Sequence, residues 1–220
     1  MINHKYKFVF AHIPKTGGMS VESALKGFGS EYVHRHGPKT EQHPHLCKHA
    51  SLLTIKNNLK DFEGYFKFAF IRNPWEWVAS NYVFNHGRHF PYLEKLKYTK
   101  YRLFKFHLNK EKKKRGEKLL KEEKDIFLFW LDWWTKGCKP SQHELICDEK
   151  NKELTDFLGN FDDFTNDFNL ITKKIGIENA VLPHRNKSKK YNYRELYNDE
   201  SIELVNSYFK KDISYFNYKF

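Results

Sequence analysis

Two stretches of the sequence place charged and hydroxyl side chains where an anion could bind. The first is HIPKTGGMS at residues 12–20, which follows a strand-like apolar run and precedes a helical pattern. Lys15 supplies a point charge, and Thr16 and Ser20 supply hydroxyl donors. Backbone N–H groups and the positive end of the helix would face a phosphate or sulfate, and the glycines would let the backbone approach it closely. The alternative interpretation is an ordinary strand-to-helix turn with a surface lysine.

The second stretch is FAFIRNP at residues 68–74, in which Arg72 comes at the carboxyl end of a predicted strand. Ligands bind at that edge of open α/β sheets. Ser80 follows eight residues later, about two turns into the next predicted helix. An arginine and a serine so placed could grip one phosphate together. A strand-end arginine can also serve only as an ion-pair partner, so this stretch does not identify a phosphate site by itself.

Hydrophobic patterning predicts the elements that position the two stretches. Residues 6–13 and 65–71 are almost continuously apolar, as in strands buried on both faces. A helix is predicted at 20–28 after the first strand and another from Trp75 after the second. Repeated strand–turn–helix units predict an α/β fold with a parallel sheet. Further elements are predicted as helices at 50–59, 125–134, 162–175 and 199–211, and as a short strand or loop edge at 154–161.

The predicted helix at 125–134 is rich in aromatic residues. Trp130, Trp133 and Trp134 could stack on a sugar ring. Their helical spacing instead favours a stripe that packs into the core.

Length and composition limit the domain organisation. The chain has 220 residues, of which 40% are hydrophobic and 17% aromatic. That is enough for one domain with a buried core, and it excludes general disorder. The formal net charge of +12 indicates an anionic partner, and most of the surplus lies between Lys95 and Lys124, where 13 Lys and Arg accompany four Glu. We expect a single domain over 1–220, with 91–124 as a basic helical insertion.

The cysteines and the apolar runs bear on metal binding and location. Cys47, Cys138 and Cys147 are few, odd in number and widely spaced, which fits a reducing compartment, and they contain no CxxC pair. We find no signal peptide and no apolar run of 18 residues. We therefore expect a cytoplasmic protein with no transmembrane segment and no metal site. The histidines of one predicted loop also lack the spacing of zinc ligands, namely His34, His36, His43 and His45.

Taken together, the two stretches resemble the sulfotransferases that use 3′-phosphoadenosine 5′-phosphosulfate (PAPS), especially the carbohydrate-type family 2 of short bacterial and Golgi enzymes. HIPKTGGMS looks like that family's 5′-phosphosulfate loop, and FAFIRNPWEWVASNY looks like its 3′-phosphate motif. The resemblance extends to KHASLLTIKNNL, GNFDDFTNDF, LPHRNKS and YFKKDISYFNYKF, and leaves out 91–124. It implies a P-loop NTPase-like three-layer fold, with a central, mostly parallel sheet flanked by helices. It also implies PAPS as donor, 3′,5′-ADP as product and no required metal.

Position by position, the resemblance implies a role for each matching residue. The loop would wrap the 5′-phosphosulfate with Lys15, Thr16, Gly17, Gly18, Met19 and Ser20. Arg72 and Ser80 would hold the 3′-phosphate. The basic loop 183–193 would bring Arg185 to the phosphates or to an anionic acceptor, and a solvated connection is the alternative. The chain departs from the family at Met19, where Thr is usual, and at Trp77, where Arg is frequent.

The resemblance also implies how the residues would divide the chemistry. Lys15 would neutralise charge that develops on the leaving phosphate oxygen, and a histidine would take the proton of the acceptor hydroxyl. His49 is favoured among the 12 histidines because CKHAS resembles the place of a catalytic histidine in related carbohydrate sulfotransferases. The ordinary pKa of histidine, about 6.5, suits a general base at neutral pH. The alternative is that His49 only caps the following helix.

Two other function classes compete with this interpretation. A P-loop kinase would need the pattern GxxxxGK[ST] and a carboxylate that binds Mg²⁺, whereas here the lysine precedes the glycines. A nucleic-acid binder would explain the charge but not the two strand-end stretches, so we expect no nucleic-acid partner. We expect the acceptor to be a carbohydrate hydroxyl, and the basic segment would suit an acidic glycan. The oligomeric state stays open.

Overall fold

The computed structural model describes residues 1–29, 47–95, 123–137, 139–183 and 192–220. The chain divides into two compact units, one formed by Met1–Arg72 and Pro140–Lys189 and the other by Asn73–Lys139 and Lys190–Phe220. The single domain expected over 1–220 stays a prediction. Most of the basic segment, the four clustered histidines and Arg185 lie outside the described residues.

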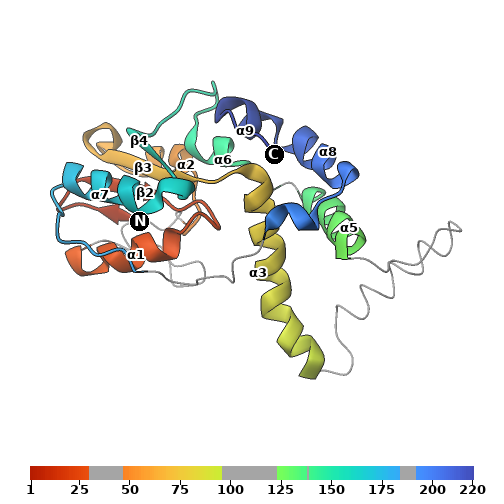
Figure 1. The fold of residues 1–220 in the computed structure, drawn as a ribbon. Coiled ribbons are helices and arrows are strands. Elements are labelled where there is room, and N and C mark those ends of the chain that lie inside the picture. The colour runs from red at the N-terminus through yellow and green to blue at the C-terminus, as the bar shows by residue number, and fades with distance from the viewer. Residues whose placement is uncertain (30–46, 96–122, 138, 184–191) are drawn as a thin grey trace, which may run out of the picture. The chain divides into compact units, whose positions relative to one another are not determined.

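A four-stranded sheet forms the centre of the first unit (Figure 1). Its strands lie in the order β1 (Ile2–Asn3), β2 (Phe8–Ala11), β3 (Phe66–Ile71) and β4 (Phe157–Asn160). β1 is antiparallel to β2, and β2, β3 and β4 are mutually parallel. The predicted α/β fold with a mostly parallel sheet is therefore confirmed.

Alternate residues of β2 and β3 form the core on one face of the sheet. Residues two apart on a strand point to the same face, and the register pairs Phe10 with Phe68. Their ring centroids are 5.1 Å apart. Most of the buried side chains of this core come from the two strands and from helices α1 (Gly18–Leu25) and α7 (Phe164–Lys174), namely Phe8, Phe10, Val21, Leu25, Phe68, Phe70, Phe168 and Ile171.

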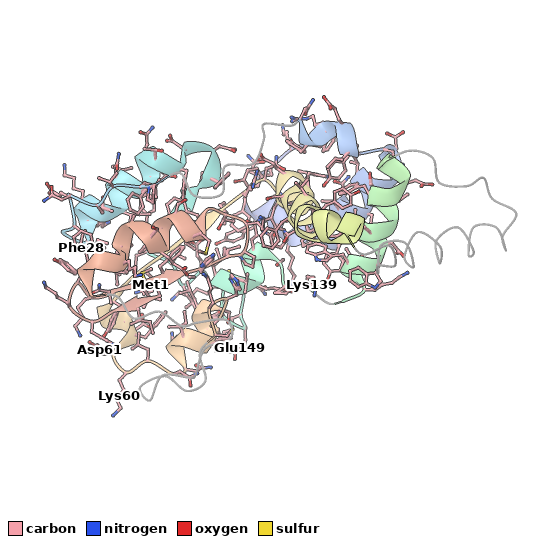
Figure 2. The ribbon with its side chains drawn as sticks, turned by 90° about the horizontal axis from the view of Figure 1, so that it is seen from below. Met1, Phe28, Lys60, Asp61, Lys139 and Glu149 are labelled. Carbon is pink, nitrogen blue, oxygen red and sulfur yellow. The ribbon has the colours of Figure 1, made fainter. Side chains whose placement is uncertain are left out.

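Helices cover both faces of the sheet. Figure 2 shows α1 and α7 on one side of the strands, and α2 (Leu52–Lys56) and α6 (Gln142–Ile146) on the other. Ser51 caps α2 by accepting a hydrogen bond from the Thr54 N–H. Ser141 and Glu144 form a capping box at the start of α6. Helices on both faces of a parallel sheet are the three layers that the resemblance implies.

The second unit is helical and has an aromatic core. It contains α3 (Pro74–Lys95), α5 (Glu123–Thr135), the short η4 (Tyr193–Leu196), α8 (Asp199–Tyr208) and α9 (Lys210–Tyr215). Trp77 meets the ring of Phe209 edge-on, with 5.4 Å between centroids. The Tyr197 hydroxyl donates to the Trp75 carbonyl over 2.7 Å. None of the described helices is both long and apolar enough to cross a membrane.

Several predicted elements differ in detail from the structure, and the helix predicted at 50–59 extends only over Leu52–Lys56. The helix predicted at 20–28 begins at Gly18 and ends at Leu25, before the 3₁₀ turn η1 (Lys26–Phe28). The helix predicted at 199–211 is interrupted at Phe209, whose backbone leaves helical geometry while its ring is fully buried. Trp130 and Trp134 are buried as predicted, but Trp133 is 60% exposed, because it lies about 80° around the helix from the middle of the face that they share.

Two neighbouring side chains of α7 provide a test of the first core. We expect Phe168→Ala to lower the free energy of unfolding by about 3–5 kcal/mol, because Phe168 is fully buried. Leu170→Ala is the matched control, since Leu170 is 55% exposed and surface changes stay within about 0.5 kcal/mol. Urea unfolding measures both, and equal effects of the two substitutions would contradict this packing.

Candidate active site

The carboxyl ends of three parallel strands lie at one edge of the sheet. His12 follows β2, Arg72 follows β3 and Phe161 follows β4. Nη1 of Arg72 donates to the Lys15 carbonyl over 3.2 Å, and its guanidinium lies 4.5 Å from the ring centroid of Phe161. The structure therefore brings Arg72 against the loop that carries Lys15, which joins the two stretches singled out in the sequence.

Helix α6 holds the backbone of Arg72 in place. The Arg72 N–H donates to Oε1 of Gln142 over 2.9 Å, and Nε2 of Gln142 donates back to the Arg72 carbonyl over 2.7 Å. Gln142 is fully buried, so water does not compete with this pair. Sequence analysis missed α6, although the capping-box pattern of Ser141 and Glu144 was a usable signal for its start.

The loop between β2 and α1 has two residues in the left-handed region. Lys15 has a φ of 66° and Gly17 a φ of 81°. The Thr16 hydroxyl donates to the Ile13 carbonyl over 2.9 Å, so this side chain braces the loop, and the expected contact of Thr16 with an anion stays a prediction. Turns of this kind can direct successive backbone N–H groups into a concavity that binds anions.

Both glycines of the loop are required by close packing. A Cβ at Gly17 would lie 2.5 Å from a ring carbon of Phe164, and a Cβ at Gly18 would lie 2.3 Å from the His12 ring. Gly17 is the N-cap of α1 and has no side chain to satisfy the N–H groups of the first turn. The positive end of the helix dipole therefore lies at the loop, beside the exposed Met19 and the buried Ser20.

A cluster of four titratable side chains lies behind the loop. Nδ1 of His12 is 2.6 Å from Oε1 of Glu22, and Nζ of Lys48 donates to Oε2 of the same carboxylate over 2.6 Å. Lys48 Nζ is also 3.0 Å from the sulfur of Met19. His49, the next residue along the chain, contacts the His12 carbonyl. Glu22 and Lys48 are functional candidates that sequence analysis did not find, because no local pattern marks them.

Burial sets the protonation of this cluster. Desolvation lowers the pKa of His12 from 6.5 to about 4, although the hydrogen bond to Glu22 opposes this shift. Burial alone would raise the pKa of Glu22, but the hydrogen bonds from His12 and Lys48 lower it from 4.5 to about 2. At neutral pH His12 is therefore uncharged, Glu22 is ionised, and Nδ1 of His12 is the donor in their hydrogen bond.

One hydrogen bond determines the tautomer of His49. Its Nδ1 lies 2.7 Å from the His12 carbonyl oxygen, which can only accept, so Nδ1 carries the proton. In the neutral ring Nε2 is then the unprotonated nitrogen. The rings of His12 and His49 also meet edge-on, with 4.7 Å between their centroids. An imidazole oriented in this way has the form that a general base requires.

Almost the whole chain, residues 1–219, matches the profile of the Sulfotransferase family. The chain belongs to the sulfotransferase family. It is therefore a transferase that acts on sulfuryl groups. No curated protein and no solved structure matches it.

Two further predicted ligands of this sulfotransferase, Ser80 and Arg185, stay predictions. Ser80 is half-buried in α3, two turns from its start, and so belongs to the second unit. Asn73 caps that helix, because its Oδ1 accepts from the Trp75 N–H over 3.1 Å. Arg185 lies outside the described residues. Within the described part of the chain, no group of three or more His, Cys, Asp or Glu is placed to hold a metal ion.

The depressed pKa of His12 predicts acid sensitivity of the sulfotransferase. Between pH 6.5 and pH 4 the unfolded chain binds a proton at His12 that the folded chain does not, so stability falls as the pH falls. Glu22 adds a loss of the same sign below pH 4.5. From pH 7 to pH 5 we expect His12 to reduce the free energy of unfolding by about 2 kcal/mol.

Urea unfolding at several pH values measures this loss. His12→Gln is expected to flatten the dependence, whatever its effect on stability at pH 7. Leu170→Ala, at an exposed position that carries no titratable group, supplies the control and should keep the wild-type slope. An unchanged slope in His12→Gln would contradict a buried, uncharged His12.

Proposed function

We propose that this sulfotransferase takes its sulfuryl group from PAPS and transfers it to a hydroxyl of a carbohydrate. The observation that carries the proposal is the hydrogen bond from Nη1 of Arg72 to the carbonyl oxygen of Lys15 in the glycine loop, over 3.2 Å. Two cationic side chains and the positive end of α1 suit a ligand with several anionic groups. Membership of the sulfotransferase family favours this donor over the ATP and Mg²⁺ of a kinase.

The residues of the loop fit the anionic end of such a donor. Backbone N–H groups from Thr16 to Ser20 would bind the 5′-phosphosulfate. The glycines at positions 17 and 18 let this loop pack closely against the rings of Phe164 and His12. Arg72, with Ser80 of α3, would hold the 3′-phosphate, and Arg185 would add a further cation. Met19 would contribute through its N–H alone.

The reaction needs charge neutralisation more than covalent work by the protein. PAPS supplies an activated sulfuryl group when bound. The acceptor oxygen forms a bond to sulfur as the bond between sulfur and the bridging phosphate oxygen breaks, which leaves a sulfate ester and 3′,5′-ADP. Lys15 would neutralise the charge that develops on the departing phosphate oxygen. No protein-bound intermediate is required.

His49 is the proposed base for the acceptor hydroxyl. Its Nδ1 is committed to the His12 carbonyl, so the proton of the acceptor would pass to Nε2. The tie between His49 and His12 supports this role, because His12 leads directly into the loop that would hold the donor. A helix cap alone would not require this orientation, and Ser51 already caps α2. The acidic-glycan acceptor and the cytoplasmic location stay predictions.

Binding of the product nucleotide is the first test of the proposed donor. We expect 3′,5′-ADP to raise the melting temperature and 5′-AMP to do so much less, because only the former carries the 3′-phosphate. A hundredfold excess over the dissociation constant stabilises the folded state by about 2.7 kcal/mol. Arg72→Ala should abolish the difference between the two nucleotides. A shift with ATP and Mg²⁺ and none with 3′,5′-ADP would support the kinase instead.

Turnover tests the roles of Lys15 and His49 separately from binding. We expect Lys15→Met and His49→Gln each to lower kcat by about a hundredfold or more. His49→Gln should leave 3′,5′-ADP binding unchanged, because the base contacts the acceptor. Transfer from ³⁵S-labelled PAPS to a panel of neutral and acidic glycans measures the rate. Full activity of both variants would refute the assignment.

A further inference from the structure

A single buried carboxylate joins two segments of the site that are far apart in sequence. Glu22 lies in α1, and its side chain is only 10% exposed. One of its oxygens binds His12, at the end of β2, and the other binds Lys48, each over 2.6 Å. Removing one partner of such a buried pair is costly, because the remaining charge is left without compensation. Glu22 therefore fixes Lys48 against the β2–α1 region.

The contacts of Glu22 continue to His49 by two routes. Along the chain, His49 follows Lys48 directly, so anchoring the Lys48 ammonium restrains the backbone of its neighbour. Through space, His12 contacts His49 twice, by its carbonyl oxygen over 2.7 Å and by its ring. Glu22, His12, His49 and Lys48 thus form a closed circuit of three hydrogen bonds and one peptide bond.

The ring of His12 has little freedom to move within this circuit. It stacks on Phe10 with 5.6 Å between centroids, and Gly18 lies so close that even a Cβ there would clash with the imidazole. The His12 ring therefore cannot rotate to compensate for a displaced carboxylate at position 22. Such a displacement would instead change the position of His49.

We infer that Glu22 is the residue that positions the His49 imidazole, acting through His12 and Lys48, and that Lys48 serves as its anchor. This inference rests on the proposed role of His49 as the base. It assigns to Glu22 no contact with donor or acceptor. It assigns to Lys48 a role in placing the base and none in binding the anionic donor.

Two variants open the circuit at different points. Glu22→Gln keeps an oxygen that can accept from His12 but cannot hold an ammonium by charge. Lys48→Met keeps the aliphatic length and removes the cation, and because Lys48 lies nearer the surface, with 18% of its side chain exposed, this variant tests the inference even if Glu22→Gln does not fold. Glu63→Gln is the matched control, since Glu63 forms an ion pair with Lys56 in the same unit but is 72% exposed.

The tautomer of His49 gives a readout that does not depend on catalysis. Long-range ¹H–¹⁵N spectra of the histidine rings, with His49→Gln for assignment, should show the proton on Nδ1 in the wild type and in Glu63→Gln. We expect the Nε2–H form of His49 to increase in both Glu22→Gln and Lys48→Met. An unchanged tautomer in both variants overturns the inference, whatever the enzyme's activity.

Kinetics then separate positioning from binding. Both variants should lower kcat by about tenfold to a hundredfold, as expected when a catalytic group is misplaced by up to 1 Å. The KM for PAPS and the affinity for 3′,5′-ADP should change less than twofold. In the double variant the losses should not add, because each substitution opens the same circuit. A raised KM for PAPS with unchanged kcat in Lys48→Met would overturn the inference, since Lys48 would then bind the donor.

The same experiments distinguish this inference from the proposed function. If PAPS supports no transfer to any acceptor and 3′,5′-ADP does not bind, the proposed function fails, while the tautomer still reports whether Glu22 orients His49. If transfer occurs and depends on His49, but Glu22→Gln and Lys48→Met change neither the tautomer of His49 nor kcat, the proposed function holds and the inference fails.

Discussion

The register between the parallel strands β2 and β3 determines where the functional residues emerge. Phe10 pairs with Phe68 and Ala11 with Ala69, so the residues that follow the two strands leave the sheet at one edge. A shift by one residue would turn the phenylalanines to the opposite face and would remove the Arg72 guanidinium from the Lys15 carbonyl, which it now meets over 3.2 Å. The buried rings therefore stabilise the fold and the site through the same contacts.

The orientation of His49 depends on close packing behind the loop between β2 and α1. Gly18 leaves room for the His12 ring, and burial of that ring keeps it uncharged at neutral pH. An uncharged His12 can donate to Glu22 without adding positive charge, so the ionised carboxylate can also bind Lys48. The carbonyl of His12 is meanwhile available to orient His49. Shape and charge thus act together to orient the His49 imidazole beside the glycine loop that follows β2.

The family match and the geometry of the first unit both agree with sulfuryl transfer. The family match covers residues 1–219 and indicates the class of reaction. Within that class, the proposed division of work has cations and helix N–H groups at the donor and an oriented histidine at the acceptor. Such a division suits sulfuryl transfer, because the departing phosphate needs charge neutralisation and the incoming hydroxyl needs a base.

The sequence by itself determined the α/β class and the family, because apolar strands and a glycine turn are local patterns, and it predicted the two stretches that carry the candidate site. It did not reveal β1 or α6, which have two and five residues and are too short for a periodic pattern. It also could not show that Trp133 faces outward, or that Glu22, Lys48 and Gln142 support the candidate site. Only the tertiary structure decided those partners, because Glu22 and Lys48 are 26 residues apart, and Arg72 and Gln142 are 70. Contacts across such separations arise from the packing of whole elements, which no local pattern of residue types encodes.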